Sequence, residues 1–404
     1  MEPMKPSFFP SSSINSACWD TAGSFDPQMP MGVSVGTRLG AEDAKIVPPG
    51  IVYAPDGSLH LSFDAPNAKS VSCEIHQKEY PMERDANGIW HAHVSCEQAG
   101  FCPLVFRIDG AEVLNPLAPI GFGGSHPINY ADIPNSEGAF YALGNVPHGT
   151  VAQNYYYSES TGTWKSCLVY LPPQYWCEPE RRFPVLYLQH GHGENEQCWI
   201  HQGRANFILD NLIAEGKAQP MIVVMNNGMV QRDQDGCRIL DFLAIEQLLL
   251  EDCIPYIDRT YRTLADRAHR AMAGLSMGSM QTSYVTLRHP ETFSYAGVFS
   301  GFVSPLGDLW RNAPDHMALL DQHDAFCEAY KVFFRACGDQ DQLVIQRFEE
   351  DSRLFASKGL APEVCPNHVI RMYRGNHEWN VWRECLRDYA QLIFQETSVR
   401  GAKE

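Results

Sequence analysis

The fold of this 404-residue chain is decided by the stretch Arg270-Ala-Met-Ala-Gly-Leu-Ser-Met-Gly-Ser-Met280. A short apolar run of strand length leads into the pattern Gly-x-Ser-x-Gly, and helix-forming sequence continues to about Arg288. The glycines at 274 and 278 suit a strained turn, because Cβ atoms there would collide with the neighbouring strand and helix. The stretch predicts that Ser276 stands between a strand and a helix, with its hydroxyl exposed over the helix N-terminus.

A serine in such a turn needs a base and an orienting acid, because its hydroxyl is a poor nucleophile near neutral pH. The expected chain order is serine, then acid, then histidine. Two carboxylates, Asp339 and Asp341, follow the apolar run 332–337, and His377 follows the run 369–373. Both runs are expected to end at the edge of the sheet where ligands bind. Ser276, Asp341 and His377 are therefore the predicted catalytic residues.

Asp341 is preferred to Asp339 as the acid. It lies three residues after Gly338, which lets the chain turn back toward the histidine. Asp339 is then expected to cap a helix, a frequent use of aspartate at such a position.

Two backbone amides are predicted to bind the negative oxygen that forms during acyl transfer. One is the N–H of Met277, directly after the nucleophile, and the other is the N–H of His192, in the loop that follows the run 185–189. His190 and His192 also form an H-x-H pair, but the adjacent glycines favour close backbone approach over a metal site. A second pair, His91 and His93, lies on a predicted strand of another domain, and there too no metal is expected.

Four aromatic side chains near these segments are candidates for the walls of a substrate pocket. Packing in the core is an equally good interpretation of them. They are Trp199, Phe302, Trp379 and Trp382.

The C-terminal two thirds alternate between buried strands and helices, which predicts an α/β domain with a mainly parallel sheet covered on both faces. The expected strands are 185–189, 221–226, 271–274, 295–300, 332–336 and 369–373. The expected helices are 206–214, 243–257, 277–288 and 341–357. Before this region, short alternating segments separated by turn signals such as Asp56-Gly57 and Asn87-Gly88 predict a small all-β sandwich. The predicted organisation is an extended arm over 1–45, the sandwich over 46–125 and the α/β domain over 126–404.

Composition excludes several classes of function. The net charge of -17 is spread without any block of like charges, so a clustered basic surface for nucleic acid is excluded. No apolar stretch reaches the 18 residues of a membrane span, and prolines interrupt the first ten residues before a secretory signal can form. The thirteen cysteines include no C-x-x-C pair and suit reduced, buried thiols. We expect a cytoplasmic protein without a cofactor.

These residues resemble the esterase D-like branch of the α/β-hydrolases, which includes bacterial feruloyl and acetylxylan esterases and enterochelin esterases. The resemblance covers about residues 145–395. It rests on Val146-Pro-His-Gly149, Pro184-Val-Leu-Tyr-Leu-Gln-His-Gly191, Phe207-Ile-Leu-Asp-Asn-Leu-Ile-Ala-Glu-Gly216, Ile254-Pro-Tyr-Ile-Asp258, Ala273-Gly-Leu-Ser-Met-Gly278 and His377-Glu-Trp-Asn-Val-Trp382. It implies the same three catalytic residues and an N-terminal immunoglobulin-like or carbohydrate-module-like domain. Ser279 and Asn376 depart from the family pattern, since relatives often carry glycine there.

The resemblance implies a serine carboxylic-ester hydrolase that acts on acylated carbohydrates or phenolic esters, most similar to feruloyl esterases. Acetylxylan and siderophore esters are the alternative substrates. Two hypotheses from other classes of function stay open: a glycan-binding protein with a vestigial hydrolase, and an acyltransferase that passes the acyl group to a sugar. Transfer of acyl groups to added sugars would identify the transferase. A homodimer is compatible with the N-terminal arm and the β domain.

Overall fold

The computed structural model describes residues 48–54, 57–95, 99–133, 136–305 and 315–395. They divide into two compact units, a β unit and an α/β unit. The β unit comprises the described residues up to Gly121 together with 127–138. The α/β unit comprises 122–126 and the described residues from 139 onward. The predicted arm over 1–45 lies outside the described residues.

The β unit is built from two sheets that share one apolar core. One sheet has the strand order β1-β2-β6-β5, and the other has the order β4-β3-β7-β10-β9 with β8 beside β7. The strands are β1 (Ile51–Tyr53), β2 (Leu59–Asp64), β3 (Val71–Ile75), β4 (Lys78–Pro81), β5 (Glu83–Arg84), β6 (Ile89–Val94), β7 (Gly100–Ile108), β8 (Ala111–Val113), β9 (Ile120–Gly123) and β10 (His126–Ile133).

Alternation along these strands explains the core. Leu59, Leu61 and Phe63 of β2 point inward, and the Phe63 ring meets Phe106 of the other sheet edge-on at 5.4 Å. Burial of such side chains from two sheets is what holds a sandwich together. The sandwich was expected to end at residue 125, but β10 still pairs with β7 as far as Ile133. The immunoglobulin-like assignment stays a prediction.

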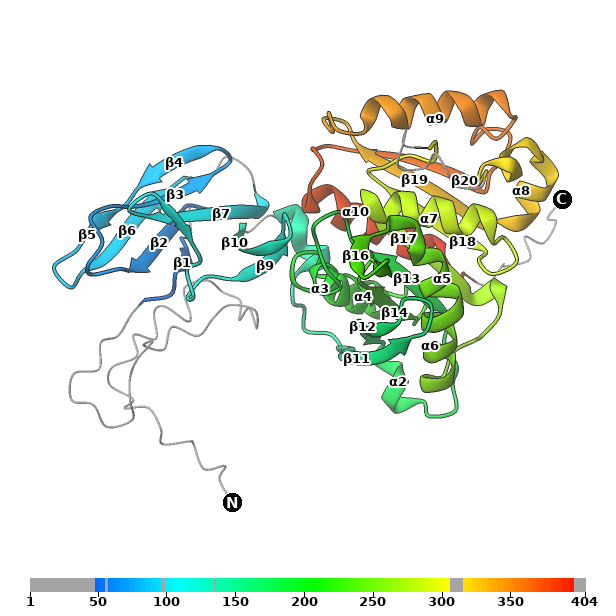
Figure 1. Cartoon of the computed structure of the whole chain (residues 1–404), viewed down its shortest axis with the longest axis horizontal. Coiled ribbons are helices and arrows are strands. Elements are labelled where there is room, and N and C mark those ends of the chain that lie inside the picture. Colours follow the sequence, from blue (N-terminus) through cyan, green and yellow to red (C-terminus); the bar gives the residue numbers. More distant parts are fainter. Residues whose placement is uncertain (1–47, 55–56, 96–98, 134–135, 306–314, 396–404) are drawn as a thin grey trace, which may run out of the picture. The chain divides into compact units, whose positions relative to one another are not determined.

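The α/β unit contains an eight-stranded sheet with the order β11-β12-β14-β13-β17-β18-β19-β20 (Figure 1). Pairing is antiparallel from β11 to β14 and parallel from there to β20. The strands are β11 (Thr150–Ser158), β12 (Thr163–Leu171), β13 (Val185–Gln189), β14 (Ile222–Asn226), β17 (Arg270–Leu275), β18 (Tyr295–Phe299), β19 (Val332–Gly338) and β20 (His368–Tyr373). The expected mainly parallel sheet is confirmed, whereas the hairpin β11–β12 was not predicted.

Helices cover both faces of this sheet. On one face α4 packs against α10, and Tyr389 of α10 contacts the Phe299 and Phe334 rings of β18 and β19. On the other face, α7 packs over β17 and β18, and α9 packs over β19. The helical segments and the separate hairpin are η1 (Ser136–Tyr141), α2 (Gln174–Cys177), α3 (Cys198–His201), α4 (Ala205–Ala214), β15 (Gln231–Gln234), β16 (Cys237–Leu240), η2 (Phe242–Ala244), α5 (Ile245–Gln247), η3 (Leu248–Cys253), α6 (Ile254–Thr260), η4 (Arg267–His269), α7 (Met277–Arg288), η6 (Ala318–Asp321), α8 (His323–Ala329), α9 (Ile345–Ser357) and α10 (Trp379–Leu392).

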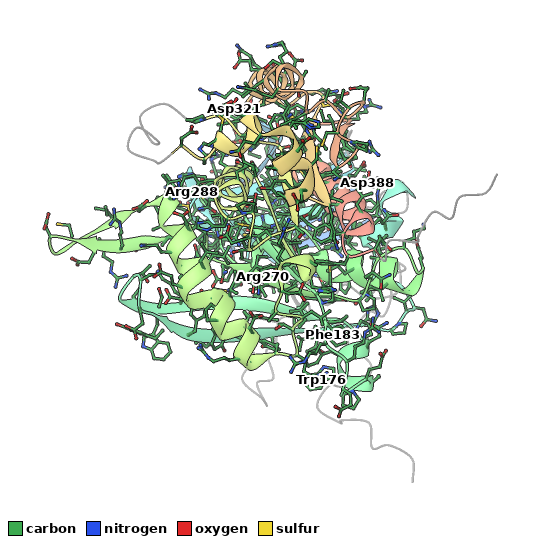
Figure 2. The ribbon with its side chains drawn as sticks, turned by 90° about the vertical axis from the view of Figure 1, so that its right-hand side faces the viewer. Trp176, Phe183, Arg270, Arg288, Asp321 and Asp388 are labelled. Carbon is green, nitrogen blue, oxygen red and sulfur yellow. The ribbon has the colours of Figure 1, made fainter. Side chains whose placement is uncertain are left out.

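The helix expected over 243–257 is present but not uniform. It passes from η2 through α5 to a π-helical turn, η3, and then to α6, in which Pro255 occupies an early position. Proline has no N–H to donate, so the helical hydrogen-bond ladder is interrupted at this position. An ion pair of 3.1 Å between Asp258 and Arg270, the first residue of β17, anchors the segment to the sheet. Arg270 is labelled in Figure 2.

Candidate active site

Ser276 lies in the sharp turn that the sequence predicts. β17 ends at Leu275, α7 begins at Met277, and Ser276 between them has φ 50° and ψ -117°. A Cβ on Gly274 would lie 2.5 Å from the backbone carbon of Gly278, and a Cβ on Gly278 would lie 2.5 Å from the carbonyl oxygen of His190. Glycine is therefore required at both positions, because the strand, helix and neighbouring loop approach each other this closely.

The structure brings Ser276, His377 and Asp341 into one hydrogen-bonded chain. Nε2 of His377 lies 2.9 Å from Oγ of Ser276, and Nδ1 lies 2.8 Å from Oδ2 of Asp341. A carboxylate only accepts hydrogen bonds, so Nδ1 carries the proton and Nε2 is free to accept the serine hydroxyl. The Asp341 side chain is fully buried and that of His377 is 20% exposed. This is the geometry of a hydroxyl whose proton has a base within reach.

The loops that carry Asp341 and His377 are joined by backbone contacts. Asp339 donates its N–H to the Tyr373 carbonyl at 2.8 Å, and its Oδ1 accepts the Gly375 N–H at 3.0 Å. A Cβ on Gly338 would lie 2.4 Å from the Gly375 carbonyl oxygen, so this approach needs glycine. The expected helix-capping role of Asp339 is thus wrong: its carboxylate holds the histidine loop.

Asp341 has further partners in the turn that precedes α9. While Oδ2 faces His377, Oδ1 accepts the N–H groups of Leu343 and Val344 at 3.2 and 3.3 Å, in the turn before α9. Both oxygens of the buried carboxylate are therefore occupied, and its orientation is fixed.

A turn at residues 191–194 runs beside the nucleophile. A Cβ on Gly191 would lie 3.4 Å from the Ser276 Cβ. Three amides of the turn already have acceptors: Gly191 N–H donates to Glu194 Oε2 at 2.8 Å, Gly193 N–H to the Met229 sulfur at 3.5 Å, and Glu194 N–H to the Gly191 carbonyl at 3.3 Å.

Within the described part of the chain, the remaining amide of this turn, that of His192, makes no hydrogen bond. The Met277 N–H, the first of α7, has no acceptor inside its helix. Both amides nominated from the sequence thus have free donors close to Ser276, where a negative oxygen would develop.

His190 supports this turn through hydrogen bonds to backbone groups. It is buried, its Nε2 accepts the Gly228 N–H at 2.9 Å, and its Nδ1 donates to the Gly191 carbonyl at 2.8 Å. Burial lowers the pKa of His190 to about 4, so the imidazole is neutral near pH 7. Both ring nitrogens are occupied by backbone groups.

The other histidine pair lies in the β unit and forms a chain with a third histidine. His60 contacts His93 through Nδ1 at 3.0 Å and His91 through Nε2 at 3.2 Å, and His91 contacts Asp85 at 3.4 Å. Because the nitrogens pair with one another, they do not converge on a common point. No group of three or more His, Cys, Asp or Glu residues suited to a metal ion occurs among the described residues.

The four aromatic residues proposed as pocket walls are packed in the interior. Trp199, Phe302, Trp379 and Trp382 are 1, 6, 3 and 6% exposed. Trp379 stands between Trp199 and Trp382 with ring centroids 5.1 and 5.2 Å apart. Trp382 meets the His377 ring at 5.1 Å. Of the two interpretations that the sequence left open, this burial favours packing in the core, and a role in substrate binding stays a prediction.

Sequence reasoning missed two side chains that shape this region. Glu194 reaches back to the turn beside Ser276, and Phe242 of η2 lies 5.7 Å from the His192 ring. Neither carries a sequence signal, because each owes its place to contacts between distant segments. No helix in the described ranges is long and apolar enough to cross a membrane.

Comparison with known proteins agrees with this architecture. The family model Esterase, described as putative esterase, matches residues 158–391. An endo-1,4-beta-xylanase/feruloyl esterase from Xylanibacter ruminicola is 35% identical over 353 residues, which is 84% of this chain and 45% of that protein. The chain therefore spans less than half the length of this relative.

Two solved structures resemble the chain. A ferulic acid esterase aligns over 62% of this chain and 100% of its own, with a TM-score of 0.52 and 26% identity. The enterobactin esterase of Shigella flexneri aligns over 83% of this chain and 92% of its own, with a TM-score of 0.54. At 14% identity, the second likeness concerns the fold alone. The resemblance inferred from the sequence is confirmed, and the chain belongs to the Esterase family of α/β-hydrolases.

Proposed function

We propose that this chain is a serine carboxylic-ester hydrolase in which Ser276 is the nucleophile, His377 the base and Asp341 the orienting acid. The observation that carries the proposal is the hydrogen-bonded chain from Ser276 Oγ through both His377 nitrogens to the buried Asp341. It begins at a serine held in a strained turn beside two free amides. This combination matches the requirements of acyl transfer through a covalent intermediate.

The reaction follows from this geometry in two steps. His377 Nε2 takes the hydroxyl proton as Ser276 Oγ attacks the ester carbonyl carbon, and Asp341 stabilises the imidazolium that forms. The Met277 and His192 N–H groups hold the oxyanion. The C–O bond to the alcohol then breaks, and the alcohol leaves with the proton from His377. Water repeats the sequence on the acyl-enzyme and releases the acid.

As substrates we propose ferulate esters, above all those carried by carbohydrate. Support comes from the 35% identical relative, which is named as a xylanase and feruloyl esterase, and from the ferulic acid esterase structure. We further propose that no metal takes part and that the protein acts in the cytoplasm. All cysteines in the described part of the chain are free, and most are buried.

Substitution of the proposed nucleophile or base tests the activity. We expect Ser276→Ala and His377→Ala to lower kcat on 4-nitrophenyl acetate and methyl ferulate by several orders of magnitude, since the members of a triad act as a unit. Ser283→Ala, elsewhere on α7, is the control and should retain activity. Wild-type-like rates in either triad variant contradict the proposal.

A substrate panel tests the specificity. Initial rates on methyl ferulate, an acetylated xylo-oligosaccharide and a triserine-lactone siderophore should rank methyl ferulate first. A higher kcat/KM on one of the others reassigns the substrate class. Feruloyl transfer to an added xylo-oligosaccharide at the expense of free ferulate indicates an acyltransferase instead.

A further inference from the structure

One carboxyl group beside Ser276 has no part in the acid–base steps above. Glu194 forms two hydrogen bonds with the same residue: Oε2 accepts the Gly191 N–H at 2.8 Å, and its own N–H donates to the Gly191 carbonyl at 3.3 Å. The turn is thus closed by backbone and side chain together. His192 lies inside it, so the direction of the His192 N–H depends on how this turn is held.

The same carboxyl group reaches a second element. The Trp379 indole N–H donates to Glu194. Trp379 is the first residue of α10 and lies two positions after His377. Its ring is 3% exposed and packed between two other tryptophans, so the donor is fixed in place. Glu194 therefore links the turn on one side of Ser276 to the helix behind the base on the other.

The surroundings of the Glu194 carboxyl group shift its pKa. Burial raises the pKa of Glu194 to about 7, although the two N–H donors favour the ionised form. The titratable neighbour on α3 is Cys198, whose pKa the Glu194 charge helps to raise. Ser276, which is hydrogen-bonded to His377, lies on the other side of Gly191 from the Glu194 carboxyl group. The group of α10 that contacts Glu194 is the uncharged indole of Trp379. Among the described residues no cation is found to compensate the carboxylate.

We propose that Glu194 is a positioning residue for acyl transfer: its carboxylate links the 191–194 turn to α10 and so orients the His192 N–H toward the oxyanion. The inference rests on the proposed function. It assigns Glu194 no contact with the substrate. Its contribution acts through the backbone of the turn.

The expected effect is on the transition state and not on substrate binding. An oxyanion donor acts at the charge that develops during attack, and losing one such donor costs about 100- to 1000-fold in kcat. A displaced donor should cost less. Protonation of Glu194 removes the negative charge and converts one acceptor oxygen into an O–H donor, which weakens the hydrogen bonds to the two N–H groups.

Glu194→Gln is the decisive variant, because it keeps the size of the side chain and removes the charge and one acceptor. On methyl ferulate we expect kcat to fall about 10- to 100-fold with KM within about twofold. The Ki of an aryl trifluoromethyl ketone, which forms an oxyanion adduct with serine, should rise by the same factor. The Ki of the product ferulate should not change.

The pH profile gives an independent readout. Because protonation removes the same negative charge as the substitution, the ratio of kcat/KM of the wild type to that of Glu194→Gln should be about 10 to 100 above pH 7 and should fall toward 1 as pH drops through about 7. Glu215→Gln is the matched control: this exposed residue follows α4 and pairs with Lys217, and it should behave as wild type.

Equal kcat and equal ketone affinity in wild type and Glu194→Gln overturn the inference. A loss of ferulate affinity as large as the loss of ketone affinity also overturns it, because it indicates a collapsed site. Glu194→Ala should lose at least as much kcat, and thermal unfolding of both variants shows whether they are folded. A wild type that hydrolyses no ester, or an active Ser276→Ala, refutes the proposed function instead. Hydrolysis by the wild type with unaffected Glu194 variants refutes this inference alone.

Discussion

Asp339 and Asp341 show how strongly one residue's surroundings define its role. They stand two positions apart after β19, yet their carboxylates have different partners. Asp341 contacts the imidazole and is fully buried, whereas Asp339 contacts a backbone N–H at Gly375. In the proposed mechanism the first interaction stabilises the positive charge that appears on His377, whereas the second restrains a loop.

This difference predicts unequal losses on substitution. Asp341→Asn should lower kcat about 10⁴-fold, because an amide favours the wrong histidine tautomer. Asp339→Asn retains an acceptor for Gly375 and should lower kcat less than about tenfold. Steady-state kinetics of the two variants on methyl ferulate checks this. A greater loss in Asp339→Asn would reverse the assignment of the acid.

At the scale of elements, α9 is fixed to the sheet by a buried charge pair. Asp351 of α9 and Arg335 of β19 are fully buried with 3.9 Å between Oδ2 and Nη2. Asp351 also accepts the Val303 N–H and the Ser304 hydroxyl in the loop after β18. Burial lowers the pKa of Arg335 to about 10, and the Asp351 charge opposes that shift. The Asp351 carboxylate thus contacts β19 and a neighbouring loop from α9, the helix that follows Asp341.

Breaking this pair should be costly. Asp351→Asn leaves the Arg335 charge buried without compensation, and we expect a loss of about 3 kcal/mol in the free energy of unfolding. Glu349→Gln, on the same helix, disrupts an exposed pair with Arg353 and should cost less than about 1 kcal/mol. Urea unfolding of the two variants measures both values. Equal stabilities would show that the buried pair does not anchor α9.

For the whole molecule, the balance of buried titratable groups sets how stability responds to pH. Burial lowers the pKa of His190 and of His368 to about 4, so each contributes stability above about pH 6.5 that is lost as pH falls toward 4. Glu194 has the opposite sign. Its pKa is raised to about 7, so its contribution is present below about pH 4.5 and is lost as pH rises through 7.

Comparison of wild type and Glu194→Gln isolates the carboxyl group from all others. Relative to wild type, the variant should gain at most about 3 kcal/mol of stability between pH 4.5 and pH 8, because it has no proton to lose there. Urea unfolding followed by tryptophan fluorescence measures this, since buried tryptophans of the α/β unit report on its unfolding. A constant difference across this range would mean that the Glu194 carboxyl group titrates normally.

The sequence by itself predicted the nucleophile and the chain order of acid and base, and it determined the parallel strands whose ends carry these residues. These features are local: a strand, a glycine-flanked turn and a helix each follow from neighbouring residues, and parallel strands place their carboxyl ends at one edge. Only the tertiary structure decided which aspartate faces His377, that four aromatic residues are buried, and that Glu194 joins the 191–194 turn to α10. The hairpin β11–β12 and the π-helical turn before Pro255 were likewise missed. Each of these depends on contacts between segments far apart in the chain, and burial and hydrogen-bond partners arise only when those segments pack together.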